Sequence, residues 1–184
     1  MYGFLLYDET EIQSGRKLVR VEPYIRIHVK QVESLFKEHY HIEQKKDFHN
    51  YTVGGSVFVL AHPENSEYCK RANGTLKYYV AQETDVNPVL ERLIQIYHEF
   101  AKPYFYKYGS VAGADLALNT NPDKWCTHNL MGAHRMMKGL IAAKLVHSPN
   151  YSELKSIYDV NIQRADHQNQ TSYELIKDYL DKLL

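Results

Sequence analysis

The sequence predicts an α+β fold in which a small antiparallel sheet packs against several helices and the C-terminal third is all helical. Residues 51–60 and 76–81 are rich in β-branched and aromatic side chains, which favours strands. Apolar residues recur every three or four positions over residues 88–102 and through the C-terminal third, which favours helices. Strand and helix signals occupy separate stretches, as in α+β proteins. A chain of 184 residues is expected to form a single globular domain, 1–184.

Residues 1–20 have an ambiguous pattern. Residues 3–7 and 17–21 are compatible with short strands on either side of a turn signal at residues 14–15. Pro23 suits the first turn of a helix, and the apolar residues after it keep helical spacing. We therefore expect a helix over residues 23–39.

The expected sheet contains residues 51–60 and 76–81. Two adjacent glycines in the first of these segments predict either a bulge within one strand or a tight hairpin turn. The connections are too short for helical crossovers, so the strands are expected to pair antiparallel. Helices over residues 88–102 and 128–147 are expected to cover one face of this sheet.

The central helix is expected to begin at Asn87, as its cap, with Pro88 in the first turn. It covers residues 88–102, because Pro103 must kink or end it. A short helix should follow over residues 110–118.

Three amphipathic helices are expected in the C-terminal third. The first spans residues 127–147 and ends before Pro149, since the residue before a proline avoids the α region. The second begins at an Asn150 cap, and the third follows the capping box formed by Thr171 and Glu174. The buried face of the first helix should contain Leu130, Met137, Ile141 and Leu145.

Composition excludes several classes of function. The chain has 22 basic and 22 acidic residues, a balance that disfavours nucleic acid as a partner. Cys69 and Cys126 cannot form a disulfide framework and are expected to be free thiols in a reducing compartment. No signal peptide or apolar stretch of about 20 residues is present, so we expect a cytoplasmic protein without membrane contact.

Spacing argues against a metal, although the chain has ten histidines. His128 and His134 would face different sides of a helix, and Cys126 would diverge from His128. His39 and His41 have no third ligand near them in the sequence. We expect no metal and no cofactor. No phosphate-binding loop or nucleophile motif occurs, so an enzyme is disfavoured, although the sequence leaves that question open.

The unusual compositional feature is the presence of 16 tyrosines. Several aromatic residues follow Pro103 closely and cannot all face one core. They form either a recognition surface for a protein partner or a packed corner between helices. The candidate partner-binding residues are Tyr104, Tyr106, Tyr108 and Trp125.

The C-terminal half also resembles a known type of protein in its layout. The aromatic segment 102–108, the segment 139–146 and the segment 149–154 follow one another as in small bacterial domains of unknown function of the polymorphic-toxin immunity-protein type. The likeness covers residues 76–184 and contains no diagnostic motif. The resemblance implies an α+β protein that binds another protein and catalyses nothing. It identifies no site residues in this chain.

The expected function is therefore that of a non-catalytic cytoplasmic protein that binds another protein, with an immunity protein that neutralises a toxin as the form the resemblance implies. The alternative is a small-molecule enzyme or ligand-binding domain with a pocket between the sheet and the helices.

Overall fold

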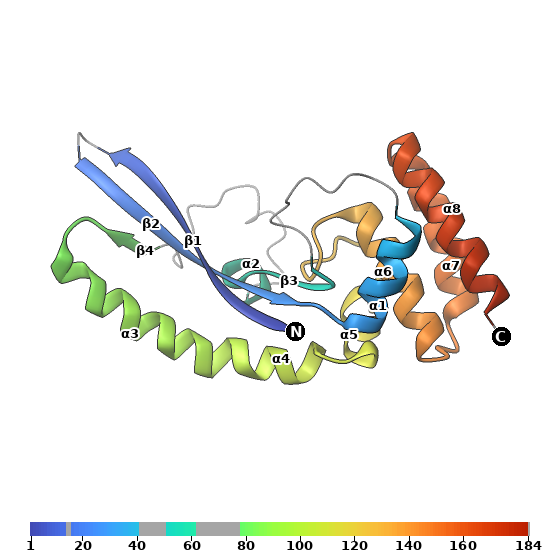
Figure 1. Ribbon diagram of the computed structural model, residues 1–184, viewed down its shortest axis with the longest axis horizontal. Coiled ribbons are helices and arrows are strands. Elements are labelled where there is room, and N and C mark those ends of the chain that lie inside the picture. Colours follow the sequence, from blue (N-terminus) through green and yellow to red (C-terminus); the bar gives the residue numbers. More distant parts are fainter. Residues whose placement is uncertain (14–15, 41–50, 62–77, 184) are drawn as a thin grey trace.

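The computed structural model describes residues 1–13, 16–40, 51–61 and 78–183, and it confirms the α+β class. A long antiparallel hairpin of β1 (Tyr2–Gln13) and β2 (Arg16–Ile27) extends away from the C-terminal helices (Figure 1). The short strands β3 (Val53–Ser56) and β4 (Tyr78–Val80) both pair antiparallel with β2. Strands therefore form at residues 3–7 and 17–21, and they are longer than those segments.

The predicted helix over residues 23–39 is wrong in its first part, because β2 continues to Ile27 and α1 spans Lys30–His39. Pro23 is instead inside a strand that has neighbours on both sides. Met1 and His28 exchange backbone hydrogen bonds, so every second residue from His28 points its N–H toward β1. Pro23 has the other orientation, and its missing N–H is directed away from β1.

Pro23 also explains why the predicted strand 51–60 is wrong beyond residue 56. The β2–β3 register ends with Tyr24 opposite Ser56, so the next residue, Val57, would face Pro23. Since proline cannot donate to a ladder, the pairing stops there. Residues Val57–Ala61 form the short helix α2. The two glycines make no hairpin turn, because both belong to β3. In the second predicted strand, residues 76–77 lie outside the described residues.

The central helix passes through Pro103, where a kink or an end was expected. Helix α3 (Val86–Ile96) leads into a π-helical turn, η3 (Tyr97–Ala101), and then into α4 (Lys102–Tyr108). Pro103 lies in the first turn of α4, where a missing N–H is tolerated. The 3-10 turn η2 (Glu83–Asp85) precedes α3, and the Asp85 carboxylate accepts from the Ala81 and Gln82 N–H groups in a capping box at the start of that turn. Asn87, the expected cap, lies inside α3.

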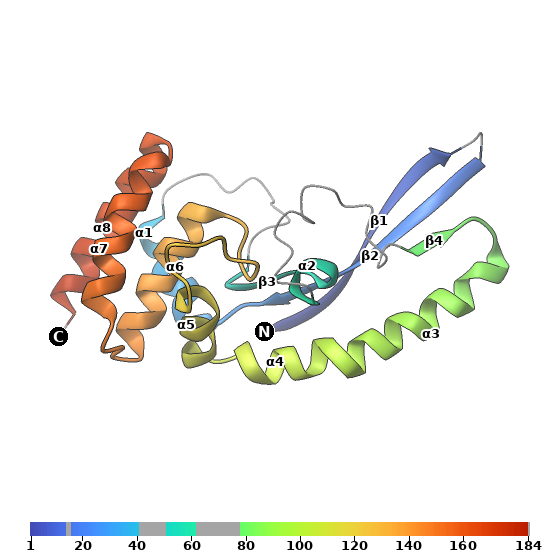
Figure 2. The ribbon, with the colours of Figure 1, turned by 180° about the vertical axis from the view of Figure 1, so that it is seen from behind.

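The remaining helices gather at the end of the molecule away from the hairpin tip (Figure 2). Helix α6 contacts helices α1, α5, α7 and α8, so it does not serve as the sheet cover that we expected. Within the described ranges, no helix is long and apolar enough to cross a membrane. The helices are α5 (Val111–Asn119), α6 (Gly132–Leu145), α7 (Tyr151–Asn161) with the 3-10 turn η4 (Ile162–Arg164), and α8 (His167–Lys182).

Two helix starts differ from the predicted ones. Helix α6 begins at Gly132, so residues 127–131 form a loop. Helix α8 begins at His167, because the Asp166 carboxylate accepts from the Asn169 N–H and caps it ahead of the Thr171 box. The predicted core face of α6 is confirmed at its centre, where Met137 and Ile141 are fully buried, whereas Leu130 and Leu145 are half-buried.

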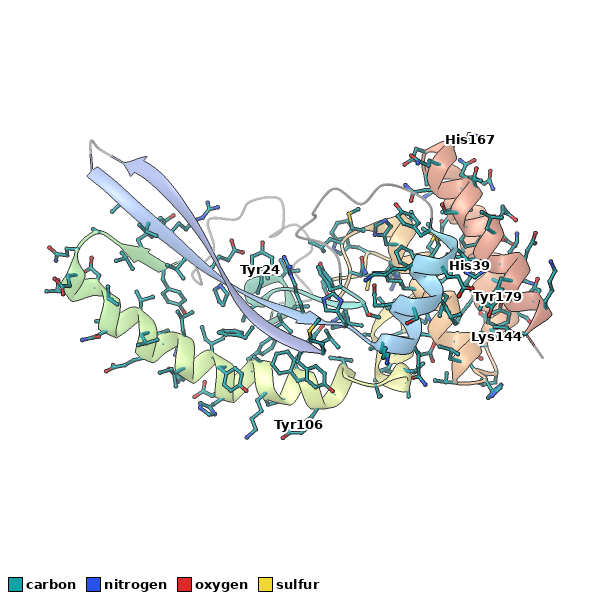
Figure 3. The ribbon with its side chains drawn as sticks, viewed as in Figure 1. Tyr24, His39, Tyr106, Lys144, His167 and Tyr179 are labelled. Atoms are coloured by element: carbon teal, nitrogen blue, oxygen red, sulfur yellow. The ribbon has the colours of Figure 1, made fainter. Side chains whose placement is uncertain are left out.

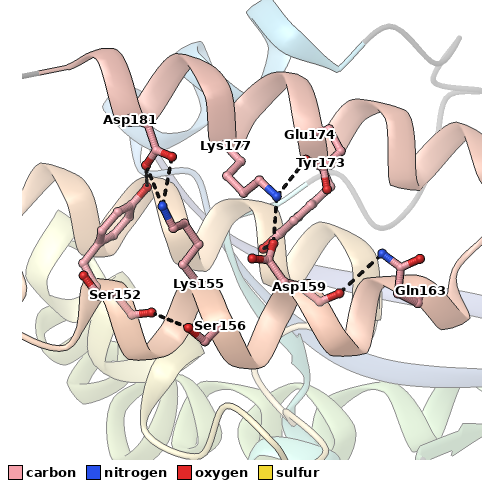
Figure 4. A network of polar contacts seen from close by, with 10 residues as sticks. Ser152, Lys155, Ser156, Asp159, Gln163, Tyr173, Glu174, Lys177 and Asp181 are labelled. Atoms are coloured by element: carbon pink, nitrogen blue, oxygen red, sulfur yellow. Dashed lines mark hydrogen bonds and ion pairs between the residues drawn. The ribbon is translucent and has the colours of Figure 1, made fainter.

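Helices α7 and α8 lie side by side and are joined by polar contacts (Figure 4). The Tyr173 hydroxyl donates to Asp159 at 3.1 Å, and the Lys177 ammonium pairs with the same carboxylate at 2.9 Å. One helical turn away on each helix, Lys155 of α7 lies 2.9 Å from Asp181 of α8. These contacts fix the register of the C-terminal helix against its neighbour.

Candidate functional site

The most distinctive surface lies where the end of α4, helix α5 and the loop 120–131 meet. We call it the aromatic corner, and we define it by Tyr104, Tyr108, Trp125 and His128. A pocket of about 340 Å³ opens here, between helices and not between the sheet and the helices as the alternative prediction had it. The corner contains three of the four residues predicted to bind a partner.

Tyr104 is placed differently from the prediction, because its side chain is only 6% exposed and cannot form part of a contact surface. Its hydroxyl lies 2.7 Å from His128 Nδ1. The Tyr108 ring packs against both side chains, with centroids 4.7 Å from Tyr104 and 4.9 Å from His128. Part of the aromatic run therefore forms a packed corner between helices, which was the second of the two interpretations of these residues.

His128 is neutral at physiological pH. Burial, followed by the positive charges of Lys107 and Arg135, lowers the pKa of His128 to about 4. Burial also raises the pKa of Tyr104 well above its usual value, so the tyrosine keeps its proton. When the Tyr104 hydroxyl donates to Nδ1, the ring proton of His128 is on Nε2. The described residues offer Nε2 no hydrogen-bond partner.

Arg135 on α6 holds the loop in place, a role that the sequence analysis missed. Its side chain is buried, and within the described chain it makes no ion pair. The guanidinium lies at the C-terminal end of α5, where the helix dipole favours a cation. At distances of 2.6–3.4 Å it donates to four backbone carbonyls, those of Leu118, Asn121, Pro122 and Lys124.

Trp125 follows directly after this clamped segment and is 56% exposed. It lines the first pocket and also a second one of about 250 Å³, so the indole stands between two hollows. Tyr108 is half-buried and lines the first pocket. Tyr106 is 80% exposed on α4 and lines neither pocket (Figure 3). The structure therefore brings Tyr108 and Trp125 together and leaves Tyr106 apart.

Of the five charged residues that line the two pockets, four are cationic. Asp123, in the second pocket, is the single carboxylate among the lining residues that the structure describes. The basic side chains are those of Lys107, Lys124, Arg135 and Arg164. Low-dielectric walls strengthen such a field, so this face attracts negative charge.

The histidines and cysteines form no group of three metal ligands within the described parts of the chain. Cys126 and His128 line the same pocket, while His39 lies on α1 against Tyr179, with ring centroids 4.3 Å apart (Figure 3). His41 lies outside the described residues, as does Cys69.

The thiol and the imidazole of the corner each have a different hydrogen-bond partner. Cys126 is a buried free thiol that donates to the Ala117 carbonyl at 3.6 Å. His128 directs one nitrogen to Tyr104, so the described residues contain no thiol–imidazole hydrogen bond of a nucleophilic site. No family model, no curated protein and no solved structure matches the chain.

Proposed function

We propose that this protein binds an acidic surface of another protein through the aromatic corner, with Trp125 as the central anchor. The observation that carries the proposal is the position of Trp125, which is exposed between two hollows in which four of the five charged lining residues are basic. Tryptophan is among the residues that most often dominate binding energy at interfaces. Complementary charge would steer an acidic partner toward this face.

The corner is also rigid, which favours binding. Arg135 fixes the loop that leads to Trp125, and the bond between Tyr104 and His128 fixes the loop after it. The His128 carbonyl accepts from the Gly54 N–H at 2.8 Å, which joins the loop to β3. A surface already held in its binding conformation loses little conformational entropy when a partner docks.

The resemblance to immunity-type domains adds a class of partner to this proposal, a toxin whose activity the binding would block. The lack of a nucleophilic or metal-binding constellation in the described chain supports a role in binding without catalysis.

The test compares two exposed aromatic residues. A partner is first captured with the wild-type protein from the native host and identified, and its affinity is measured by calorimetry. Trp125→Ala should weaken binding by about 2 kcal/mol or more, as expected for an anchor. Tyr106→Ala, which removes an exposed ring outside both pockets, should bind as the wild type does. Undiminished binding by Trp125→Ala would contradict the proposal.

A second candidate function is the binding of a small molecule, which the size of the first pocket favours. Its volume of about 340 Å³ lies at the lower end of the range of ligand pockets, roughly 300–1,000 Å³. Native mass spectrometry of protein purified from its host is the test. A stoichiometric metabolite that Trp125→Ala fails to retain would support this candidate over the first.

A further inference from the structure

Two polar groups in the first pocket have no hydrogen-bond partner among the residues that the structure describes. Thr127 is only 7% exposed and lines the pocket, yet its hydroxyl makes no hydrogen bond with any residue the structure describes. His128 is the next residue and also lines the pocket, and its Nε2 makes no hydrogen bond with any described residue. Neither atom is enclosed by the protein, so each can donate to an acceptor that enters the pocket.

The charge around these groups selects the kind of acceptor. Lys107 and Arg135 line the pocket, and its described lining contains no carboxylate. Both cations contribute to the lowered pKa of His128, after burial, so the potential is positive where Nε2 lies. The Arg135 guanidinium donates to backbone carbonyls, so it contributes charge more than hydrogen bonds.

We propose that this pocket is a carboxylate site that receives an Asp or Glu side chain of the protein partner. The Thr127 hydroxyl and the His128 Nε2–H are the donors, and Lys107 at the rim supplies the counter-charge. A carboxylate has the single negative charge and the paired acceptor oxygens that this set matches. As a statement about the partner, the assignment rests on the proposed function.

Tryptophan fluorescence can report binding in this pocket, because Trp125 lines the pocket and is the single tryptophan of the chain. The probe is N-acetyl-glutamic acid α-amide, which has one side-chain carboxylate, and the matched control is N-acetyl-glutamine α-amide. The acid should change the Trp125 emission saturably in the millimolar range, as expected for so small a ligand. The neutral amide should cause no saturable change. Equal responses to both probes, or tighter binding of inorganic phosphate, would overturn the assignment.

Three variants locate the site. Thr127→Val removes a hydroxyl that has no partner among the described residues, so the variant should stay folded. Its affinity for the acid probe should be about tenfold lower. Lys107→Met removes an exposed charge at the rim of the pocket and should lower the affinity for the acid probe by about two- to fivefold. Lys102→Met removes an exposed lysine of the same helix that does not line the pocket, and it should have no effect. Unchanged affinity of a folded Thr127→Val protein contradicts the carboxylate site.

The proposed function and the carboxylate site can fail separately. A captured partner that needs Trp125 but binds Thr127→Val as tightly as the wild type would leave the proposed function standing and overturn the carboxylate site. Acid binding that depends on Thr127, with a free carboxylic acid retained and no protein partner, would support the site and overturn the proposed function.

Discussion

Lys138 Nζ lies 2.8 Å from Glu33 Oε1, and the two side chains are almost completely buried between α6 and α1. The ammonium also donates to the Tyr51 carbonyl at 2.8 Å and lies 4.5 Å from the centre of the Phe36 ring. The Thr52 hydroxyl donates to Glu33 at 2.7 Å. This pair therefore joins α1, α6 and the chain entering β3 at one buried point.

The charged form of Glu33 is the one this site stabilises. Burial by itself raises the pKa of Glu33, but the Lys138 charge and the hydrogen bonds from Lys138 and Thr52 outweigh burial and lower it. Burial also lowers the pKa of Lys138, against the charge of Glu33 and the hydrogen bond to it, which both favour the ammonium. The Glu33 carboxylate is therefore ionised at neutral pH, with Lys138 as its buried partner.

Removal of one member of the pair should be far more harmful than removal of both. Lys138→Met should lower the free energy of unfolding by about 3–5 kcal/mol, because it leaves an uncompensated buried carboxylate. The double variant Glu33→Gln, Lys138→Met should recover a large part of that loss. Urea unfolding at pH 7 measures both, and a loss below about 1 kcal/mol in Lys138→Met would contradict this account of the pair.

Gly139 is required by close packing between α6 and α5. A Cβ at this position would overlap Asn119 Oδ1, which accepts from the Tyr158 hydroxyl at 2.6 Å, while Asn119 Nδ2 donates to the Gly139 carbonyl. Gly139→Ala should therefore cost about 1–3 kcal/mol through overpacking. Gly132→Ala in the same helix is the matched control, since its Cβ meets nothing within 4 Å.

For this pair of glycines, the measurement is the shift in the thermal midpoint of each variant. Gly132→Ala should be neutral or stabilising, because alanine favours helix. Equal shifts of the midpoint in the two variants would show that the contact with Asn119 does not decide the effect at Gly139.

The C-terminal helices were predictable because their signals are local. Apolar spacing places α6, α7 and α8 correctly, and the errors are confined to their ends. Both Asp166 and Thr171 have cap chemistry, and the sequence does not say which one starts the helix. Asp166 does so in the structure, through its bond to the Asn169 N–H.

The sheet could not be predicted from local signals, because its strands pair with residues that are distant in the sequence. Pro23 has the local signature of a helix start, yet it belongs to a strand because no described neighbour needs its N–H. The same proline stops the ladder with β3, so the β-branched residues after Ser56 become helical. Neither outcome can be inferred from residues 51–60 alone.

At the aromatic corner the sequence indicated Tyr108 and Trp125, but not the residues that complete the site. Thr127 was expected to cap a helix, and Arg135 was not noticed. A signal for Arg135 did exist, because it lies in a helix otherwise rich in alanine, glycine and methionine. A charge at such a position must find buried partners, but only the fold identifies them as the carbonyls of loop 120–131.

The contact between α7 and α8 offers a test of the C-terminal register. Tyr173 is fully buried, and burial together with Asp159 raises the pKa of its hydroxyl far above the usual value. Tyr173→Phe should lower stability by about 1 kcal/mol, the usual contribution of one hydrogen bond. Tyr151→Phe is the control, because that hydroxyl lies 3.4 Å from an exposed Asp181 carboxylate. A larger loss in Tyr151→Phe would contradict the assigned importance of Asp159.

The pH dependence of stability should report the burial of His128. Its pKa is about 4 in the folded protein, because burial, Lys107 and Arg135 disfavour the imidazolium, against 6.5 for a free histidine. Between these values the unfolded chain binds a proton that the folded protein does not, so stability decreases as the pH falls from about 6.5 to about 4. The gap corresponds to up to about 3 kcal/mol.

His128→Asn removes the titrating group and keeps an acceptor for the Tyr104 hydroxyl. The decrease in unfolding free energy between pH 7 and pH 4 should therefore be smaller in this variant than in the wild type, by up to about 3 kcal/mol. His147→Asn is the matched control, because His147 is exposed and has a φ of 53°, a conformation that asparagine tolerates. Urea unfolding at a series of pH values gives the slopes. Equal slopes in His128→Asn and His147→Asn would show that folded and unfolded His128 bind the proton equally well, which would contradict the lowered pKa of this imidazole.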